Sequence, residues 1–312
     1  GTGAVKITPS HDPNDFEIWK RHKQAISDPP RTVIGTDGKM TELAGAYSGL
    51  SRDEARNRII KDLEEKLGED GKPFLERSEP YQHSVALCYR CQQMIEPMLS
   101  QQWFMHMNPL ATKAIEAVRK GQFHIYPESW YEPYTRWLGD IQDWCLSRQI
   151  WWGHRIPVWY CVFCAGSQLH ARIIDADNKI LSGTVATLLK LGTSLEEIKE
   201  KGRYSYSSNE GSPKKGIHVG SEPTSCSSCS GTLWLQEQDV LDTWFSSALW
   251  PLSLFGWPQE TLDLKFYYPT TVLVTGYEIL YLWVARMQML GLHLKKQVPF
   301  TDALIHGIVR DK

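Results

Sequence analysis

The sequence lacks several features that would assign it to a special class of protein. It contains no run of 18 apolar residues, which argues against a membrane-spanning helix. Its first residues, GTGAVKITPS, contain no apolar core segment, so we expect no signal peptide there. A net charge of −2 over 312 residues argues against a general basic coat for nucleic acid. We find no internal repeat, and we expect a cytoplasmic protein without a membrane partner, an organellar location remaining open.

Helices are predicted where capping residues enclose an apolar period. In residues 51–68, Ser51 with Glu54 three positions later forms a capping box, and Gly68 marks the end. The apolar residues of this segment fall on one face of the helix: Ala55, Ile59, Ile60, Leu63 and Leu67. We predict a second helix at 109–120, opened by Pro109 and followed by Gly121, and a short one near 194–201.

The pattern from Asp239 onward is that of an α/β domain. TTVLVTG (270–276) predicts a buried strand, YEILYLWVARMQMLG (277–291) a helix that is apolar on nearly all sides, and DALIHGIVRD (302–311) another buried strand. This order implies a right-handed parallel crossover, as in a Rossmann-type sheet. Gly276 and Glu278 would then lie at the carboxyl end of a strand, where parallel sheets bind ligands.

Six of the seven cysteines form three C-x-x-C pairs, a spacing typical of metal ligands. Cys161 and Cys164 (WYCVFCAG) and Cys226 and Cys229 (TSCSSCSG) can together surround one Zn²⁺ with four thiolates. Such a closed site has no open position, so its role would be in folding and not in catalysis. The alternative is four reduced cysteines in tight turns.

The third pair, Cys88 and Cys91 in ALCYRCQQ, has no obvious matching pair. His83 or His106 could complete a second metal site, and a knuckle without metal is an equal alternative. Cys145 stands alone in DWCLSRQ and is interpreted as a buried apolar residue.

The segment KITPSHDPNDF (6–16) places His11, Asp12 and Asp15 between two prolines, directly after the strand-like run GTGAVKIT. Proline is excluded from helix interiors and central strands, so we predict a rigid loop that presents carboxylates. The loop is either part of a site or an Asx turn in which Asp12 caps the following element.

Aromatic and basic residues alternate in DWCLSRQIWWGHRIPVWY (143–160). Arg148, His154 and Arg155 lie among Trp151 and Trp152, a mixture that suits phosphate and base binding. Packing of the tryptophans in a domain junction explains the pattern equally well.

These segments together resemble class Ia aminoacyl-tRNA synthetases of the Val/Ile/Leu group. The matching blocks are GTGAVKITPSHDPNDFE, DWCLSRQIWWGHRIP, DVLDTWFSSALWPLS and TGYEILYLWVARM, and they occur in the family's order across residues 1–312. KITP, HDPND and TG-x-[DE]-IL-x-x-W-x-ARM favour the valine-specific branch. The alternatives are an isoleucine-specific synthetase and, in a different class, a non-enzymatic zinc-ribbon protein that binds RNA.

The resemblance implies an α/β fold with a partial Rossmann-type parallel sheet, an inserted mixed α/β portion of an editing domain and a small zinc-knuckle module. Residues 1–125 would be the C-terminal part of the editing domain and 126–160 the junction that returns to the catalytic domain. Residues 161–235 would be the zinc-knuckle insertion, and 236–312 the second half of the catalytic domain. The His-Ile-Gly-His motif would precede residue 1 and the Lys-Met-Ser-Lys-Ser loop would follow residue 312, so we expect this segment alone to form no adenylate.

The resemblance also implies roles for residues in both halves of such an enzyme. In editing, Asp15 would bind the α-ammonium of a misattached amino acid, while Lys6, Thr8 and Asp12 line the pocket. In synthesis, Trp244 and Trp283 would shape the pocket for valine, with Gly276 and Glu278 against the adenosine of ATP. The family usually has Asp at position 278, so Glu278 departs from its pattern. The residues expected near the mouth of the active site are Arg148, Trp151, Trp152 and His154. The implied partners are tRNA(Val), valine and ATP with Mg²⁺. The enzyme is expected to be a monomer.

Overall fold

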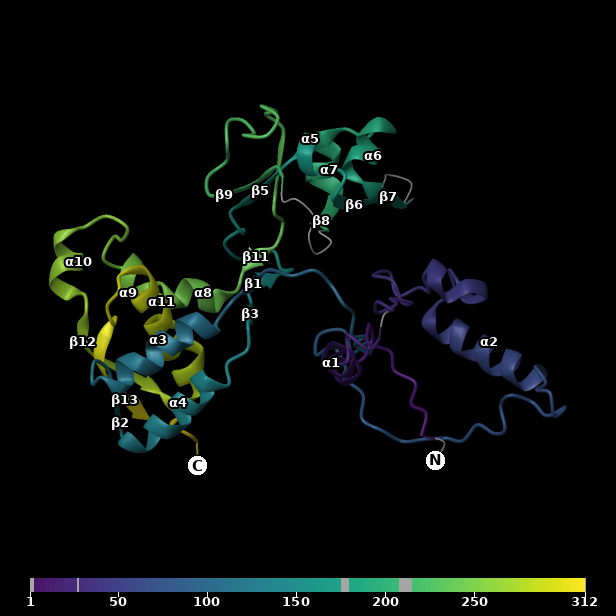
Figure 1. The fold of residues 1–312 in the computed structure, drawn as a ribbon, viewed down its shortest axis with the longest axis horizontal. Coiled ribbons are helices and arrows are strands. Elements are labelled where there is room, and N and C mark those ends of the chain that lie inside the picture. The colour runs from purple at the N-terminus through teal and green to yellow at the C-terminus, as the bar shows by residue number, and fades with distance from the viewer. Residues whose placement is uncertain (1–2, 27, 175–179, 208–214, 312) are drawn as a thin grey trace. The chain divides into compact units, whose positions relative to one another are not determined.

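The computed structural model describes residues 3–26, 28–174, 180–207 and 215–311. The chain forms two compact units, Gly1–Ser100 and Gln101–Lys312 (Figure 1). Residues 101–125, which the sequence assigned to the same domain as the preceding segment, therefore fold with the second unit. Among the described helices, none combines the length and the apolar character needed to cross a membrane.

The described part of the first unit contains the helices α1 (Pro13–Arg21) and α2 (Arg52–Glu65) and the 3₁₀ helix η1 (Glu42–Tyr47). The predicted capping box of α2 is confirmed, with Ser51 and Glu54 each bonded to the other's backbone amide. The helix ends at Glu65 and not at Gly68, because Lys66 has an extended backbone and Gly68 begins a turn closed by Lys72.

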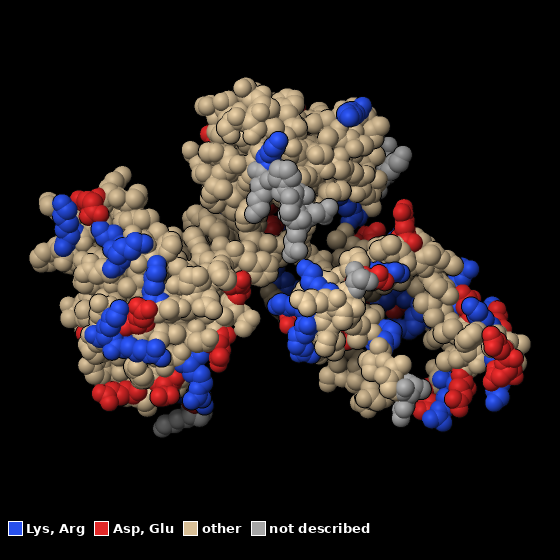
Figure 2. Space-filling view, in the orientation of Figure 1, with Lys and Arg blue, Asp and Glu red and all other residues tan. Residues whose placement is uncertain are grey.

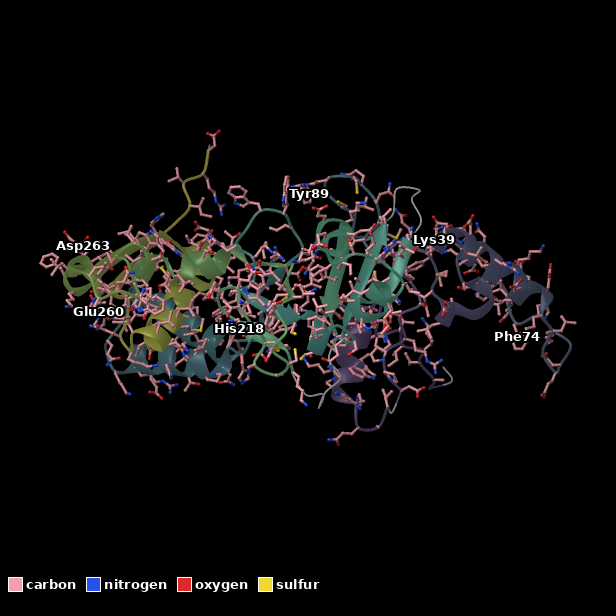
Figure 3. All side chains as sticks on the ribbon, turned by 90° about the horizontal axis from the view of Figure 1, so that it is seen from above. Lys39, Phe74, Tyr89, His218, Glu260 and Asp263 are labelled. Atoms are coloured by element: carbon pink, nitrogen blue, oxygen red, sulfur yellow. The ribbon has the colours of Figure 1, made fainter. Side chains whose placement is uncertain are left out.

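The first unit has almost no apolar core of its own. In its described residues, Ala55 is the one buried hydrophobic side chain, and Leu63 and Leu67 on the predicted apolar face of α2 are exposed. Phe74 and Tyr89 likewise project from this unit (Figure 3). The strand predicted in GTGAVKIT is wrong for its described part, because residues 3–8 pair with no strand and a strand without a partner is not stable.

The second unit contains the predicted parallel sheet. Its strands are β2 (His124–Tyr126), β12 (Thr270–Gly276) and β13 (Phe300–His306), in the order β12-β13-β2, and both pairings are parallel. The predicted strand–helix–strand unit is therefore confirmed. β13 begins two residues before the predicted 302 and ends at His306, and residues 307–311 are exposed and form no strand.

Helices cover one face of this sheet. They are α3 (Asn108–Arg119), α4 (Tyr131–Gly139) and α11 (Ala285–Leu294), and their apolar residues share one core with Leu273, Ala303 and Ile305 of the strands. The helix predicted at 109–120 is thus confirmed. The opposite face holds Val272 and Val274, which are 48% and 60% exposed. The prediction that both strands are buried on both faces is therefore wrong for this chain, since these helices lie on one side only.

A second core lies in the middle of the same unit. Strands β6 (Leu169–Ile174), β7 (Ile180–Thr184) and β8 (Gly202–Tyr206) form an antiparallel sheet in the order β7-β6-β8. The helices that accompany it are α5 (Val162–Ala165), α6 (Val185–Lys190) and α7 (Leu195–Lys201). α7 confirms the short helix predicted near 194–201. A second antiparallel sheet, in the order β10-β5-β9, consists of β5 (Val158–Cys161), β9 (Ile217–Val219) and β10 (Trp234–Gln236).

Short elements join these two cores. Strand β1 (Phe104–Met105) pairs with β3 (Trp144–Cys145), and β4 (Ser147–Arg148) pairs with β11 (Val240–Leu241). Helices α8 (Thr243–Ala248), α9 (Trp250–Ser253) and α10 (Leu262–Tyr267) follow, and a 3₁₀ turn, η2 (Glu128–Trp130), precedes α4. Acidic and basic side chains are interspersed over both units on the face that Figure 2 displays, in agreement with the small net charge.

Candidate functional site

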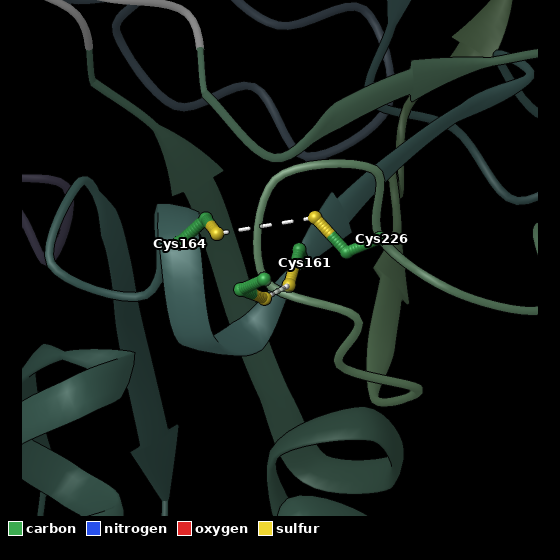
Figure 4. A group of neighbouring side chains, drawn as sticks. Cys161, Cys164 and Cys226 are labelled. Atoms are coloured by element: carbon green, nitrogen blue, oxygen red, sulfur yellow. Dashed lines mark hydrogen bonds between the residues drawn. The ribbon is translucent and has the colours of Figure 1, made fainter.

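Four cysteines form one compact group beside β5 (Figure 4). The four sulfur atoms lie within 4.8 Å of one another, with Cys161 Sγ 3.6 Å from Cys229 Sγ and Cys164 Sγ 3.9 Å from Cys226 Sγ. Four sulfurs each about 2.3 Å from a tetrahedral zinc ion would lie about 3.8 Å apart. The group therefore has the dimensions of a four-thiolate metal site, and these residues can hold a metal ion.

Two glycines allow the cysteine knuckles to approach each other. Gly216 has φ +74°, and a Cβ at this position would lie 2.4 Å from Cys164 Cβ. A Cβ at Gly231 would lie 2.5 Å from the Phe163 ring. Both distances are shorter than contacts between carbon atoms permit, so only glycine fits at these two positions.

Backbone amides point at the sulfur atoms of the second knuckle. The N–H of Ser228 donates to Cys226 Sγ and the N–H of Gly231 donates to Cys229 Sγ, both at 3.4 Å. The first of these bonds lowers the pKa of Cys226 to about 7, whereas the hydrogen bond with Cys229 raises the pKa of Cys164 to about 12. Amide donors stabilise the thiolate form, which is the form that binds metal.

A cavity of about 400 Å³ adjoins this group. Its lining includes His218, Trp234 and the hydroxyl side chains of Ser221, Thr224, Ser225 and Ser227. Trp234 also packs against Cys161 and Cys226, so the cavity is part of the surroundings of the cysteine group.

Cys88 and Cys91 are not joined by a third metal ligand in the described part of the chain. The ring of His83 stacks on Tyr81, and His106 Nδ1 lies 3.0 Å from Asp143 Oδ1. Cys145 is half-buried, with its sulfur 3.9 Å from Gln102 Oε1.

The carboxyl edge of the parallel sheet brings together residues from two strands. Gly276 at the end of β12 lies opposite His306 at the end of β13. The carboxylate of Glu278 stands directly over Gly276, where a Cβ would lie 2.2 Å from Glu278 Oε2. The sequence contains no signal for His306, because the predicted strand 302–311 placed it in the middle of the strand, whereas β13 ends at this residue. This edge thus carries a carboxylate that covers the Gly276 backbone and, on the neighbouring strand, the exposed His306.

Helix α8 connects the other predicted residues of the synthetic site. β12 continues into a 3₁₀ turn, η3 (Tyr277–Ile279), and a π-helix, η4 (Leu280–Val284), which orients Trp283. Trp283 Nε1 donates to the carbonyl oxygen of Ser247 at 3.1 Å, and His154 Nδ1 lies 3.2 Å from Ser246 Oγ. Both serines belong to α8, as does Trp244, so the structure gathers His154, Trp244 and Trp283 around one helix.

Other residues of the predicted junction have different environments. Trp151 and Trp152 are almost fully exposed. Arg148 is paired with Asp242, and Arg155 donates to the carbonyl oxygens of Gln236 and Glu237. Because both guanidinium groups have intramolecular partners, the forked phosphate binding considered for this segment has little support.

The acidic loop of the first unit is held by its own hydrogen bonds. Asp12 Oδ1 accepts from the amides of Asn14 and Asp15, so Asp12 is the N-cap of α1, as one interpretation of the sequence had it. Asp15 Oδ2 accepts from both the amide and the hydroxyl of Thr8, at 2.7 and 3.2 Å. His11 Nε2 accepts from the backbone amides of residues 33 and 34, which joins this loop to that segment. Lys6 is exposed.

Comparison with known proteins shows the family to which the chain belongs. A model of the family "tRNA synthetases class I (I, L, M and V)" matches residues 14–312. A valine–tRNA ligase of *Carboxydothermus hydrogenoformans* is 47% identical over 311 residues, and one of *Desulfotalea psychrophila* is 44% identical over 312. A third, of *Thermotoga maritima*, is also 44% identical over 312 residues.

Each of these alignments covers 100% of the chain and 28% or 29% of the relative. The chain thus spans less than a third of the length of the curated relatives that it matches. A non-enzymatic zinc-ribbon protein does not account for a family match that covers nearly the whole chain. The chain belongs to the class I tRNA synthetase family of the I, L, M and V group.

Proposed function

We propose that the chain is part of a valine–tRNA ligase, which attaches valine to tRNA(Val) with ATP through valyl-adenylate. The observation that supports this best is the gathering of Trp244 and Trp283 around α8, beside similarity to valine–tRNA ligases over the whole chain. The whole reaction belongs to the longer protein. This segment alone is not expected to form the adenylate.

In the synthetic reaction, the Glu278 carboxylate that covers Gly276 would turn to the ribose, and Gly276 would then let the adenosine of ATP approach the backbone at the carboxyl edge of the sheet. Glu278, which stands over Gly276, accepts hydrogen bonds from ribose hydroxyls. Trp244 and Trp283 form an apolar pocket for the valine side chain, whose burial favours binding. Mg²⁺ accompanies ATP and neutralises charge on its phosphates.

The junction residues border the same site. His154 is attached to α8 through Ser246, and Arg148 lies at the start of that helix through its bond to Asp242. Trp151 and Trp152 offer exposed rings at the mouth of the active site. In this proposal residues 126–160 are the return from the editing insertion, and 236–312 are part of the catalytic domain.

The same enzyme would hydrolyse tRNA(Val) charged with threonine, using the first unit as part of its editing domain. Thr8 orients Asp15, whose carboxylate binds the α-ammonium of the misattached amino acid. Lys6 and Asp12 border this pocket, and its polar groups favour the hydroxyl of threonine because valine would leave them unpaired. The nucleophile is a positioned water, helped by hydroxyl groups of the substrate.

We assign a structural Zn²⁺ to the four cysteines of residues 161–235. The sulfur separations and the N–H donors to Cys226 and Cys229 support this assignment. The experiment is to measure the zinc content of purified protein. We expect about one Zn²⁺ per chain, lost in Cys226→Ser and retained in the matched control Cys91→Ser. Equal zinc content in both variants would refute the assignment.

The synthetase function is tested with the full-length protein that contains this segment. Amino-acid-dependent ATP–pyrophosphate exchange should be fastest with valine, and Trp283→Ala should raise KM for valine. Exchange that prefers isoleucine would favour the isoleucine-specific alternative. Exchange by the 312-residue segment alone would contradict its assignment as half of a catalytic domain.

Editing is tested by deacylation of Thr-tRNA(Val) and Val-tRNA(Val) with the same full-length protein. We expect the threonyl ester to be hydrolysed preferentially, and Asp15→Ala to abolish this reaction without changing valine activation. Unchanged deacylation by Asp15→Ala would remove Asp15 from the editing site. The protein is further proposed to act as a cytoplasmic monomer, which size-exclusion chromatography with light scattering can test.

A further inference from the structure

The carboxylate of Asp242 is the buried centre of a hydrogen-bond network that the assigned site residues do not explain. Its side chain is 8% exposed. Oδ2 accepts from Trp144 Nε1 at 3.0 Å and from Arg148 Nη2 at 2.5 Å. Oδ1 accepts from the backbone amide of Trp244 at 3.0 Å. A buried carboxylate needs such partners, and here they come from the return segment and from α8.

The backbone of the same residue is also paired with the return segment. The amide of Asp242 donates to the carbonyl oxygen of Leu146 at 2.7 Å, next to the β4–β11 pairing. Asp242 is therefore bonded to residues 144–148 through both its main chain and its side chain. One residue thus fixes where the returning chain meets the start of α8.

Groups from α11 and α8 pack against the Trp144 ring beside this centre. The guanidinium of Arg286 on α11 stacks on the Trp144 ring, 3.8 Å from its centroid, and Phe245 of α8 packs against the same ring at 6.2 Å. Two arginines, Arg148 and Arg286, thus accompany a single carboxylate. The carboxylate supplies the negative charge that allows both cations to lie near one tryptophan.

Helix α8 depends on this centre because it has only six residues. A helix of this length is not stable by itself, so its position is set by its cap and by its contacts. Its N-cap is Asp242, and its residues include Trp244 and the two serines that hold His154 and Trp283. A shift of the cap would therefore move the whole proposed valine pocket.

We propose that Asp242 is a positioning residue for amino-acid selection: by joining Trp144 and Arg148 to the first turn of α8, it fixes the pocket that Trp244 and Trp283 form. The inference rests on the proposed valine activation. It adds to that proposal a residue that touches neither valine nor ATP but determines how well the pocket fits the amino acid.

The side-chain chemistry makes Asp242→Asn the informative substitution. Asparagine keeps the size and one oxygen, which can still accept from the Trp244 amide. Its NH₂ group would face the N–H groups of Trp144 and Arg148, all of which are donors. The variant thus keeps the cap and loses the link to the return segment.

The experiment is steady-state ATP–pyrophosphate exchange with the full-length protein, normalised to active sites by adenylate burst so that misfolded protein is not counted. We expect Asp242→Asn to raise KM for valine about tenfold, since a displacement of about 1 Å in a site has effects of this order or larger. The preference for valine over isoleucine should fall, and kcat should change less than twofold. Asp242→Glu, which restores the charge, should recover part of the loss.

Two further variants distinguish positioning from general destabilisation. Arg148→Met should raise KM for valine in the same direction, and combining it with Asp242→Asn should add little, because the two residues act as a unit. Asp239→Asn is the matched control, since the side chain of Asp239 bonds Gln149 and Arg203. Because neither of these partners belongs to α8, the KM for valine of this variant should stay within twofold of the wild-type value.

The outcomes separate this inference from the function on which it rests. If the unaltered protein shows no valine-dependent exchange, the proposed function itself is overturned. If it is active and Asp242→Asn lowers Tm while KM and the valine preference stay within twofold, Asp242 has only a structural role and the inference is wrong. A rise in KM with additive effects of Arg148→Met would also overturn the proposed link.

Discussion

Replacing Glu237 with glutamine should destabilise the second unit measurably. Glu237 is 6% exposed, and the two oxygens of its carboxylate accept four hydrogen bonds. Oε2 accepts from the hydroxyl of Tyr160 at 2.6 Å and from Trp103 Nε1 at 3.0 Å. Oε1 accepts from the backbone amides of Gln238 and Asp239. The carboxylate therefore connects the chain entering at Trp103 with β5.

The expected magnitude follows from the partners. In Glu237→Gln the amide oxygen can keep the two backbone bonds, and the Tyr160 hydroxyl can turn to accept from the new NH₂ group. The indole of Trp103 is a donor only, so its N–H loses its partner. An unpaired buried donor costs about 1–3 kcal/mol, and the lost charge-assisted bonds add a similar amount. Glutamine is neutral, so the variant no longer buries a charge, and this offsets part of the cost. The expected net loss in the free energy of unfolding is about 2–3 kcal/mol.

Urea unfolding followed by tryptophan fluorescence measures this change. The matched control is Glu260→Gln, whose exposed carboxylate pairs with Lys295 in solvent and should contribute little to stability. For a unit of this size the loss in Glu237→Gln corresponds to roughly 4–12 °C in Tm. A change in the free energy of unfolding no larger than that of the control would refute the reasoning about Trp103.

Three further predictions concern other parts of the chain. Gly216→Ala should weaken zinc binding at least tenfold, because the added Cβ would collide with Cys164. Gly220→Ala is the control, since Gly220 also has a positive φ but no atom lies closer than 3.7 Å to its Cβ position, and it should leave zinc binding unchanged. Competition with a chelator measures both affinities. Amide hydrogen exchange should be faster in α2 than in α3, since the first unit buries one described apolar side chain. Burial raises the pKa of several tyrosines in the folded protein. The same tyrosines ionise at about pH 10 in the unfolded chain, so the free energy of unfolding should fall as pH rises above about 10. Absorbance at 295 nm should show that these tyrosines ionise as the protein unfolds. These tyrosines are Tyr134, Tyr160, Tyr204, Tyr206 and Tyr268. Separate ionisation of all tyrosines before unfolding would contradict the last prediction.

The sequence by itself determined the features that depend on neighbouring residues. The capping box at Ser51, the helix at 109–120 and the strand–helix–strand order after 270 were predicted because caps, prolines and apolar periods act within a few residues. Each C-x-x-C pair was predictable because its spacing is a local signature of metal-binding knuckles, and the structure brings the two predicted pairs together.

Only the tertiary structure decided the features that depend on distant residues. Strand β2 has three residues, too few for a sequence signal, and it is a strand because β13 lies beside it. GTGAVKIT has a strand-like sequence, but no partner strand pairs with its described part. The partners of Asp242 lie far from it in sequence, Trp144 by 98 positions and Arg148 by 94. Local patterns therefore specified the elements and the C-x-x-C pairs, whereas burial and long-range hydrogen bonds determined which residues come together at the candidate site, because both depend on parts of the chain that meet only after folding.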